Sequence, residues 1–569
     1  MSADVQPASA LPEFTRWLAG SERPRPASHK HIEPLHPDEA VTFMLILRRR
    51  PGTVPSPQIP FDGPSSISRE EYVQMYGADP IDLESAVAFL QVQGMSVLEA
   101  HAGRRTLSVL ATAAQVQSVF GVNLQRYEDA GAIELLPPNG DEARAHRGFD
   151  GAVYLPAELA ESVTAVVGLD NRFLGIPRGA ATSDGVGPSN PTVSAVAQKL
   201  KIPNTGAYGE VIGIFAAQPA GSPGIAPCYL PSDITHLYFA NQPIGYRTRP
   251  LSILDINLTV GATTYKNDPS QVEKIAVLSD ADSATLELTQ EIATSVTVAQ
   301  GARVNVYFTE ASEQGYLTFM NRVLLPEREK QPTVLSFSLA LCEGAAAKDG
   351  APHAGSSSLA YLVEDLFHQI ALLGISIFVA MGERGSDCWR LLAAPNLSPA
   401  AVSPQLHHSF QGVKSSSATI ATALSAASLL PASRAAGGGD FSTVSGATGI
   451  PDIGSEAAYG GFFVNGVSYS YAGPSCVAAF YAGTTALLRS AFGTGLGFLN
   501  SMLFQLKKTR LLKNNPNHDG GSCDLPGAAP DESDHTQPAA PDAQFFSRER
   551  PSRSRLARWF AMPLPMSTH

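Results

Sequence analysis

The chain has 569 residues and a formal net charge of −12; 44% of its residues are hydrophobic and only 16% are charged. This length and apolar content predict about three packed domains of ~150 residues each, or two of unequal size. The negative charge argues against a nucleic-acid partner, because proteins that bind phosphate backbones present a basic face.

The first 35 residues are rich in proline and charged side chains, and we expect them to be mobile. They contain no apolar stretch of the kind found in an ordinary signal peptide. Residues 41–47 then predict a strand, because β-branched and apolar side chains dominate there. If the protein is exported, the N-terminal residues therefore do not indicate it.

Strands and helices alternate over the next stretch of about 140 residues. A Ser cap predicts a helix that starts at residues 67–72. Further helices are predicted at 82–93, 112–120 and 158–167, and further strands at 94–98 and 106–110. We interpret residues 36–174 as a compact α+β sandwich.

Residues 175–192 have the composition of an exposed linker, because glycine, proline and small polar residues predominate. Such segments are natural sites of proteolytic cleavage. The linker therefore predicts a boundary between two domains.

The region after the linker has a different pattern. Short, continuously apolar runs predict buried strands at 211–215, 304–308, 333–338 and 375–380. Helices are predicted between them, at 284–298, 314–325 and 357–373. Strands buried on both faces and separated by helices predict an α/β fold with a parallel sheet, whose functional sites lie beyond the carboxyl ends of the strands.

No segment of the sequence is long and apolar enough to predict a membrane span; the longest apolar run, residues 371–381, is too short. The five cysteines have no metal-binding spacing, and their odd number leaves at least one thiol outside a disulfide. Residues 512–569 are expected to be poorly ordered. The basic end of this tail is compatible with contact to a membrane or an acidic partner, but a solvated tail is the favoured interpretation.

One stretch, residues 471–483, combines a Gly-Pro turn with a run of small apolar residues typical of a buried helix. Ser475 lies in the first turn of this predicted helix. Backbone N–H groups and the helix dipole there would stabilise an oxyanion formed beside the hydroxyl. The alternative, which these residues alone favour, is that Ser475 only caps the helix.

A nucleophilic serine needs a partner that takes its proton, and no histidine stands in a setting typical of a Ser-His-Asp triad. Glu287 and Glu291 are better placed, because a spacing of four puts them on one helix face. Shielded from water, two such acids share a proton at acidic pH. Glu383 follows the predicted strand at 375–380 and is a further candidate. The alternatives are a solvated acidic helix face for the pair and an ordinary surface-loop acid, next to Arg384, for Glu383.

Several motifs in a specific order resemble the sedolisins, the serine-carboxyl peptidases. The resemblance runs from about residue 40 to 506. The N-terminal part is similar to their activation prosegment at residues 48–50, 68–72, 76–78, 119–122 and 166–170. The later part is similar to their catalytic domain at residues 301–308, 449–453, 473–476 and 497–500.

The resemblance implies a subtilisin-like parallel sheet with flanking helices (residues 193–511), preceded by the prosegment (residues 36–174) as its intramolecular inhibitor. It further implies Ser475 as nucleophile, Glu287 as general base, Glu291 as the acid that orients Glu287, and Glu383 as the donor to the oxyanion. The implied activity is acid-dependent hydrolysis of polypeptides by a self-processing proenzyme, either an endopeptidase or a tripeptidyl-peptidase. Bound Ca²⁺, a secreted location and a monomeric state are also implied.

The sequence departs from the family pattern in ways that keep a second hypothesis open. The family has Asp at the positions of Glu291 and Glu383 and Thr at that of Pro474, and the calcium loop is not recognisable beyond Leu506. Each Asp-to-Glu change moves a carboxyl by roughly 1.5 Å, and a displacement of about 1 Å can cost ~100-fold in rate. The alternative is therefore a catalytically degenerate homologue that binds peptides or a partner protein.

Overall fold

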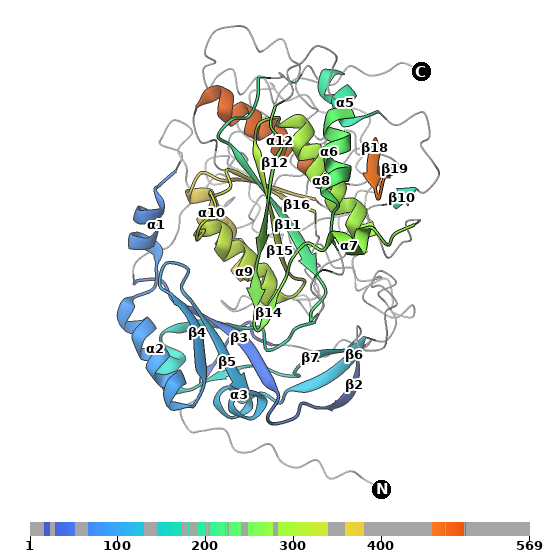
Figure 1. Ribbon diagram of the computed structural model, residues 1–569. Helices are drawn as coiled ribbons and strands as arrows, with labels where there is room; N and C mark the ends of the chain where they lie inside the picture. The colour runs from blue at the N-terminus through green and yellow to red at the C-terminus, as the bar shows by residue number, and fades with distance from the viewer. Residues whose placement is uncertain are drawn as a thin grey trace, which may run out of the picture.

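The computed structural model describes most of the chain up to residue 496. The described residues are 16–22, 29–51, 66–129, 145–172, 180–182, 191–338, 359–380 and 458–496, with short breaks at 200–201, 203–204, 222–223, 225–226, 241–248, 277–282, 473 and 494–495. They form an N-terminal unit and an α/β unit (Figure 1).

The α/β unit is built on a five-stranded sheet in which every adjacent pair of strands is parallel, in the order β12-β15-β11-β16-β17. Its strands are β11 (Val211–Gln218), β12 (Ser252–Asn257), β15 (Arg303–Glu310), β16 (Val334–Phe337) and β17 (Ser376–Val379). The predicted parallel α/β sheet is thus confirmed. Strand β12 was not predicted, because as a half-exposed edge strand it mixes polar and apolar residues and lacks a continuous apolar run.

Helices cover both faces of this sheet. One face packs against α8 (Ser283–Val298) and α12 (Pro474–Phe492), and α5 (Val193–Lys199), α6 (Pro231–Ala240) and α7 (Pro269–Val272) join the same core. The other face packs against α9 (Glu313–Leu324) and α10 (Leu359–Leu372). Successive side chains of a strand point to opposite faces, so Ile214 joins the first core and Phe215 the second.

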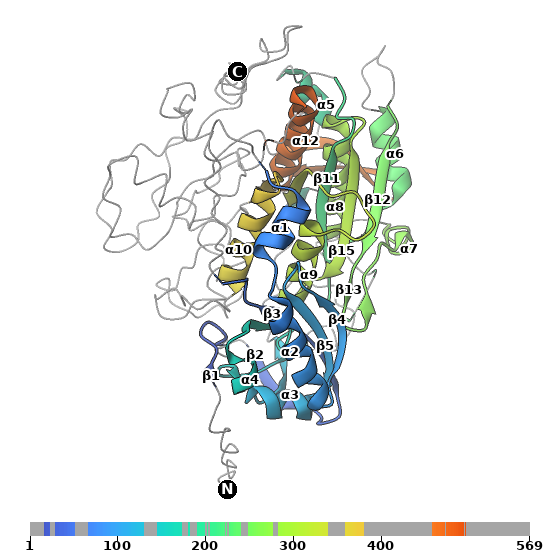
Figure 2. The same cartoon turned by 90° about the vertical axis from the view of Figure 1, so that its left-hand side faces the viewer.

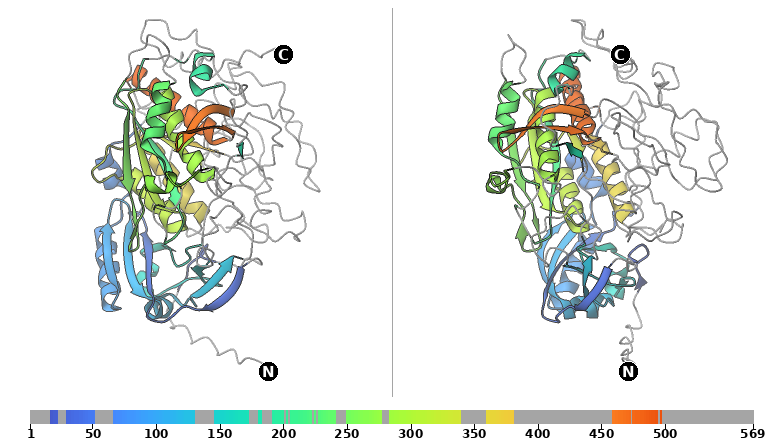
Figure 3. Two further views of the ribbon diagram at one scale, coloured as in Figure 1. Left: turned by 45° about the vertical axis from the view of Figure 1, so that its right-hand side comes forward. Right: turned by 90° about the vertical axis from the view of Figure 1, so that its right-hand side faces the viewer.

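A hairpin of β18 (Ala458–Val464) and β19 (Val467–Ala472) stands beside α6 and α8 and leads into α12 (Figure 3). Its two-residue loop is Asn465-Gly466, both at positive φ, which suits a tight hairpin turn. The carboxylate of Asp233 accepts hydrogen bonds from the backbone N–H groups of Asn465 (2.7 Å) and Gly466 (3.0 Å). A third strand, β10 (Ala180–Thr182), pairs with β19 in antiparallel fashion.

The N-terminal unit contains a four-stranded antiparallel sheet in the order β4-β5-β3-β9. Its strands are β3 (Ala40–Leu47), β4 (Ser96–His101), β5 (Thr106–Thr112) and β9 (Val163–Val167), and its helices are α1 (Arg69–Tyr76), α2 (Pro80–Val92), α3 (Ala113–Phe120) and α4 (Ala157–Ala160). A capping box of Ser68 and Glu71 starts α1, as the predicted Ser cap indicated. A three-stranded sheet has the order β2 (His29–Pro34), β6 (Gln125–Asp129), β7 (Ala145–Gly148). Two smaller sheets pair β1 (Arg16–Trp17) with β8 (Tyr154–Leu155) and, in the α/β unit, β13 (Thr259–Val260) with β14 (Thr263–Thr264).

Two sequence-based expectations for this unit differ from the structure. The helix predicted at 158–167 is wrong beyond Ala160, because the β-branched residues that follow form strand β9 against β3. Part of the N-terminal stretch expected to be mobile forms strands β1 and β2 instead. Pairing with later strands orders a sequence whose own composition predicts little structure.

The N-terminal unit covers the end of the α/β unit toward which β11 and β15 point, which is the carboxyl edge of the parallel sheet (Figure 1). Strand β3 contributes to two cores: Phe43 and Leu45 pack within the N-terminal unit, whereas Met44 and Ile46 pack against α9 and α10. Helix α1 lies along α10 (Figure 2), and the backbone N–H of Ile67 donates to the carbonyl of Leu372 at 2.9 Å. The two units therefore share a continuous apolar core.

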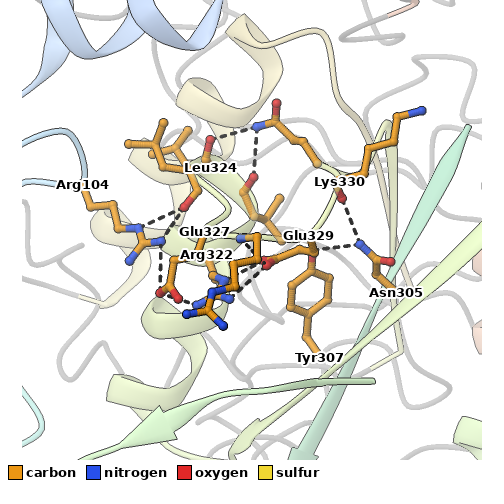
Figure 4. Close-up of polar contacts among 12 residues, drawn as sticks. Arg104, Asn305, Tyr307, Arg322, Leu324, Glu327, Glu329 and Lys330 are labelled. Carbon is orange, nitrogen blue, oxygen red and sulfur yellow. Dashed lines mark hydrogen bonds and ion pairs between the residues drawn. The ribbon is translucent and has the colours of Figure 1, made fainter. Parts of the chain in front are cut away.

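Charged residues reinforce this junction. Arg104, in the turn between β4 and β5, donates to the carbonyl oxygen of Leu325 and lies 3.8 Å from the carboxylate of Glu327 (Figure 4). Arg322 binds the neighbouring acids Glu327 and Glu329, which fixes the loop that Arg104 contacts. None of the described helices is both long and apolar enough to cross a membrane.

Candidate active site

Ser475 lies at the carboxyl-terminal side of strand β19, as the second residue of helix α12. The helix starts with Pro474, which is favourable in a first turn because its missing N–H needs no partner there. Ser475 thus lies inside the predicted first turn rather than at the N-cap position, so the capping interpretation does not describe its place. Its side chain is fully buried.

Glu287 and Glu291 project from α8, which packs closely against α12. Both are buried, with exposed fractions of 6% and 1%. The alternative interpretation of this pair as a solvated acidic helix face is therefore wrong. Their four-residue spacing on a buried helix places both acids on the side of the sheet where Ser475 lies.

The structure brings Ser475 and Glu287 together, although 188 residues separate them in the sequence: the Ser475 hydroxyl donates a hydrogen bond to Oε1 of Glu287. Because neither side chain is exposed, water does not compete for this contact. A hydroxyl held against a buried carboxylate is the arrangement in which the acid can take the proton as the oxygen becomes a nucleophile.

A second hydroxyl reaches the same carboxylate oxygen. The phenol of Tyr471, on β19, donates to Glu287 Oε1 at 3.1 Å. Sequence reasoning gave Tyr471 no role; its position four residues before Ser475, at the end of the strand that leads into α12, was the available signal.

Glu291 is held by strand β16, where the Ser336 hydroxyl donates to its Oε1. Burial raises the pKa of Glu291 to about 8; the negative charge of Glu287 adds to this, and the hydroxyls of Ser336 and Ser338 oppose it. Glu291 is therefore a neutral acid at acidic and neutral pH, able to donate a hydrogen bond. Ser336 is the second residue that sequence reasoning missed, because a polar residue inside an apolar strand has many structural explanations.

Several predicted features lie outside the described residues and stay predictions. These are the position of Glu383, the segment beyond Leu506 in which a calcium loop would fall, and the tail after residue 511. Within the part of the chain that the structure describes, no three His, Cys, Asp or Glu side chains are grouped so as to hold a metal ion. Cys228 and Cys476, both within the described residues, are buried and are not joined in a disulfide.

Comparison with known proteins gives matches over both units. Residues 61–172 match the family model described as "Pro-kumamolisin, activation domain". Tripeptidyl-peptidase sed5 of Aspergillus fumigatus is 30% identical over 542 residues, which cover 86% of this chain and 89% of that protein. Kumamolisin of a Bacillus species is 24% identical over 387 residues, or 65% of this chain and 61% of that protein.

Among solved structures, Pseudomonas sedolisin, a serine-carboxyl proteinase, covers 58% of this chain and 86% of its own at 17% identity, with a TM-score of 0.36. The match to the fungal enzyme extends over most of the length of both proteins. The chain therefore belongs to the sedolisin family of serine-carboxyl peptidases, and residues 61–172 lie in its pro-kumamolisin activation domain.

Proposed function

We propose that this protein is an acid-active serine peptidase, made as a proenzyme, that hydrolyses polypeptides with Ser475 as nucleophile, Glu287 as general base and Glu291 as its protonated neighbour. The observation that carries the proposal is the buried hydrogen bond from the Ser475 hydroxyl to Glu287. The family's reaction supplies the class of substrate.

In the proposed reaction, the Ser475 oxygen attacks the carbonyl carbon of a peptide bond while its proton passes to Glu287. The tetrahedral oxyanion forms near the N-terminus of α12, where the helix dipole favours negative charge. Glu287 then returns the proton to the departing amine, and water releases the acyl group by the same steps in reverse. Glu383 stays the proposed donor to the oxyanion, by family resemblance.

The two acids in this proposal set the lower and the upper pH limits of activity. Glu287 has to be ionised to act as a base, whereas Glu291 has to keep its proton to donate to it. The raised pKa of Glu291, about 8, means that the second condition holds throughout the acidic range. Secretion into an acidic extracellular medium would suit such an enzyme.

The course of the linker supports self-processing. Residues Ala180–Thr182 pair in antiparallel register with Ser470–Ala472 of β19, the strand that continues to Ser475. A peptide substrate binds in the same way when its backbone extends a strand beside the nucleophile. This pairing supports the linker of the proenzyme as the first substrate of Ser475.

The test is the cleavage of denatured haemoglobin at pH 3–5 by the parent protein, Ser475→Ala and Glu287→Gln, after mass spectrometry has shown whether the linker is cut at pH 4. We expect the parent to cut both linker and haemoglobin, and both variants to lose at least ~10³-fold in rate. Tripeptide products would identify a tripeptidyl-peptidase, and internal fragments an endopeptidase. Activity that survives in Ser475→Ala would refute the nucleophile, and an inactive parent with a cut linker would favour the peptide-binding alternative.

A further inference from the structure

The carboxylate of Glu287 is shared by two hydroxyls on the same oxygen. Oε1 accepts from Ser475, the proposed nucleophile, and from Tyr471 at 3.1 Å. A carboxylate oxygen has two lone pairs, so both bonds can exist at once. Protonation of Oε1 by Ser475 would use one lone pair and leave the other for Tyr471.

We propose that Tyr471 is a positioning residue of the active site: its phenol fixes Oε1 of Glu287 in line with the Ser475 hydroxyl and stabilises the ionised form of that carboxylate. This inference rests on the proposed function, which gave Tyr471 no part. It deepens that function by naming the group that keeps a buried acid available as a base.

The place of Tyr471 in the fold explains how the phenol is held. Its backbone is paired on one side with Tyr459 of β18 and on the other with Ala181 of β10. The side chain is fully buried, so the ring cannot turn into solvent. After the linker is cut, the pairing with β18 remains and keeps the strand in place.

Burial also makes the hydrogen bond from Tyr471 important for the charge state of Glu287. Glu287 is 6% exposed, so hydroxyl donors have to replace the water that would otherwise solvate its charge. Hydrogen bonds to an ionised group favour the ionised form and are stronger than those between neutral groups. Without the phenol, Glu287 would accept a solvent proton at a higher pH and would be inactive as a base over more of the acidic range.

The main experiment compares Tyr471→Phe with Tyr481→Phe in the processed enzyme. Tyr481 is a fully buried tyrosine of α12 that has no place in the proposed reaction. For Tyr471→Phe we expect kcat to fall about tenfold and the acidic limb of its pH profile to move up by about one unit, with KM unchanged, as for the loss of one charge-assisted hydrogen bond. Tyr481→Phe should leave the limb in place. An unmoved limb in Tyr471→Phe, or the same shift in both variants, would overturn the proposal.

A second readout separates this inference from the proposed function. The rate at which a fluorophosphonate labels Ser475 reports activation of the hydroxyl without any peptide cleavage. If the fluorophosphonate labels the parent but the parent cleaves no peptide, the peptidase proposal fails. An acidic limb of the labelling-rate pH profile that moves up in Tyr471→Phe would still support the role of Tyr471.

If Ser475 does not label in the parent, a double-mutant cycle on urea unfolding of the full chain decides. Tyr471→Phe should then lower the unfolding midpoint by less in a Glu287→Gln background than in the parent, because the charged acceptor is gone. An equal shift in both backgrounds would overturn the inference.

Discussion

At the scale of single residues, the protonation state of Glu291 is the property that distinguishes this site from an ordinary pair of carboxylates. A helix spacing of four is common on solvated surfaces, where both acids are ionised at neutral pH. Here Glu291 is 1% exposed, and burial raises its pKa to about 8. Glu291 therefore keeps its proton at pH values where an exposed glutamate would be ionised.

This protonation state predicts how stability depends on pH. The folded-state pKa of Glu291 lies above the unfolded value of about 4.5, so its contribution is fully present below pH ~4.5 and is lost as the pH rises through ~8. Glu291→Gln removes the titrating group while keeping a neutral side chain of similar shape. We expect the urea midpoint of the parent to fall relative to that of Glu291→Gln between pH 5 and pH 9.

The measurement is a set of urea unfolding curves for both proteins at pH 5, 7 and 9. Glu158→Gln, which replaces an exposed glutamate on α4, serves as the control and should follow the parent at each pH. Parallel curves for the parent and Glu291→Gln would contradict a raised pKa, because a group that titrates equally in both states leaves stability independent of pH.

At the scale of helices and strands, the sequence predicted the elements that carry the site better than the contacts between them. The helix predicted at 284–298 and the strand predicted at 304–308 match α8 and β15 closely, because long periodic and continuous apolar runs are strong local signals. The bond between Tyr471 and Glu287 has no such signal. It depends on the register of β19 and on the approach of β19 to α8, which only tertiary packing determines.

The burial of the two acids could not be predicted for the same reason. The spacing of Glu287 and Glu291 marks them as candidates, but alone it favours a solvated face, and the resemblance to a family supplies their roles. Strand β9 shows the opposite failure. Its residues follow a helical turn, so the sequence pattern predicts that the helix continues, although three valines among five residues favour a strand. Strand propensity identifies an element such as β9 only when the end of the preceding helix is known.

A glycine sets the distance between the two helices of the site. A Cβ atom at Gly483 of α12 would lie 2.9 Å from the Cβ of Val298 on α8, closer than such atoms approach. The absence of a side chain therefore lets α12 pack closely enough for Ser475 to reach Glu287. This is a requirement of helix packing, because Gly483 is not among the residues at positive φ.

We accordingly expect Gly483→Ala to destabilise the protein by about 1–3 kcal/mol, the usual cost of overpacking a core. It should also reduce peptidase activity, because a helix shift of about 1 Å lengthens the bond between Ser475 and Glu287. Thermal unfolding and kcat at pH 4 are the measurements. Adding Val298→Gly, which removes the Cβ atom that the new methyl group meets, should recover part of both losses, and a double variant no better than Gly483→Ala would argue against this contact.

At the scale of the whole molecule, the junction between the units combines an apolar core with a buried cluster of charges. Asp365 of α10 accepts from Arg105 at 2.9 Å and also pairs with Arg49, both from the N-terminal unit. These side chains are between 6% and 12% exposed. Two guanidinium groups thus meet a single carboxylate at a site that water scarcely reaches.

The cluster predicts that Asp365 holds the activation domain on the peptidase unit. Asp365→Asn would leave two buried positive charges facing each other, and breaking a buried ion pair in this way costs about 3–5 kcal/mol. The variant should therefore open the junction, which hydrogen exchange of residues 102–105 and 359–372 in the full chain at pH 7 would detect. We expect exchange there to quicken while exchange in β5 stays slow.

Asp82→Asn is the matched control, because it removes the partner of Arg48 within the N-terminal unit at a site where Arg48 is 38% exposed. Exposed pairs contribute about 0–1 kcal/mol, so this variant should exchange like the parent. Adding Arg49→Met to Asp365→Asn relieves the repulsion and should slow exchange again. If Asp365→Asn and Asp82→Asn behave alike, the apolar surface formed by Met44, Ile46 and the helices α9 and α10 holds the units together without help from the charges.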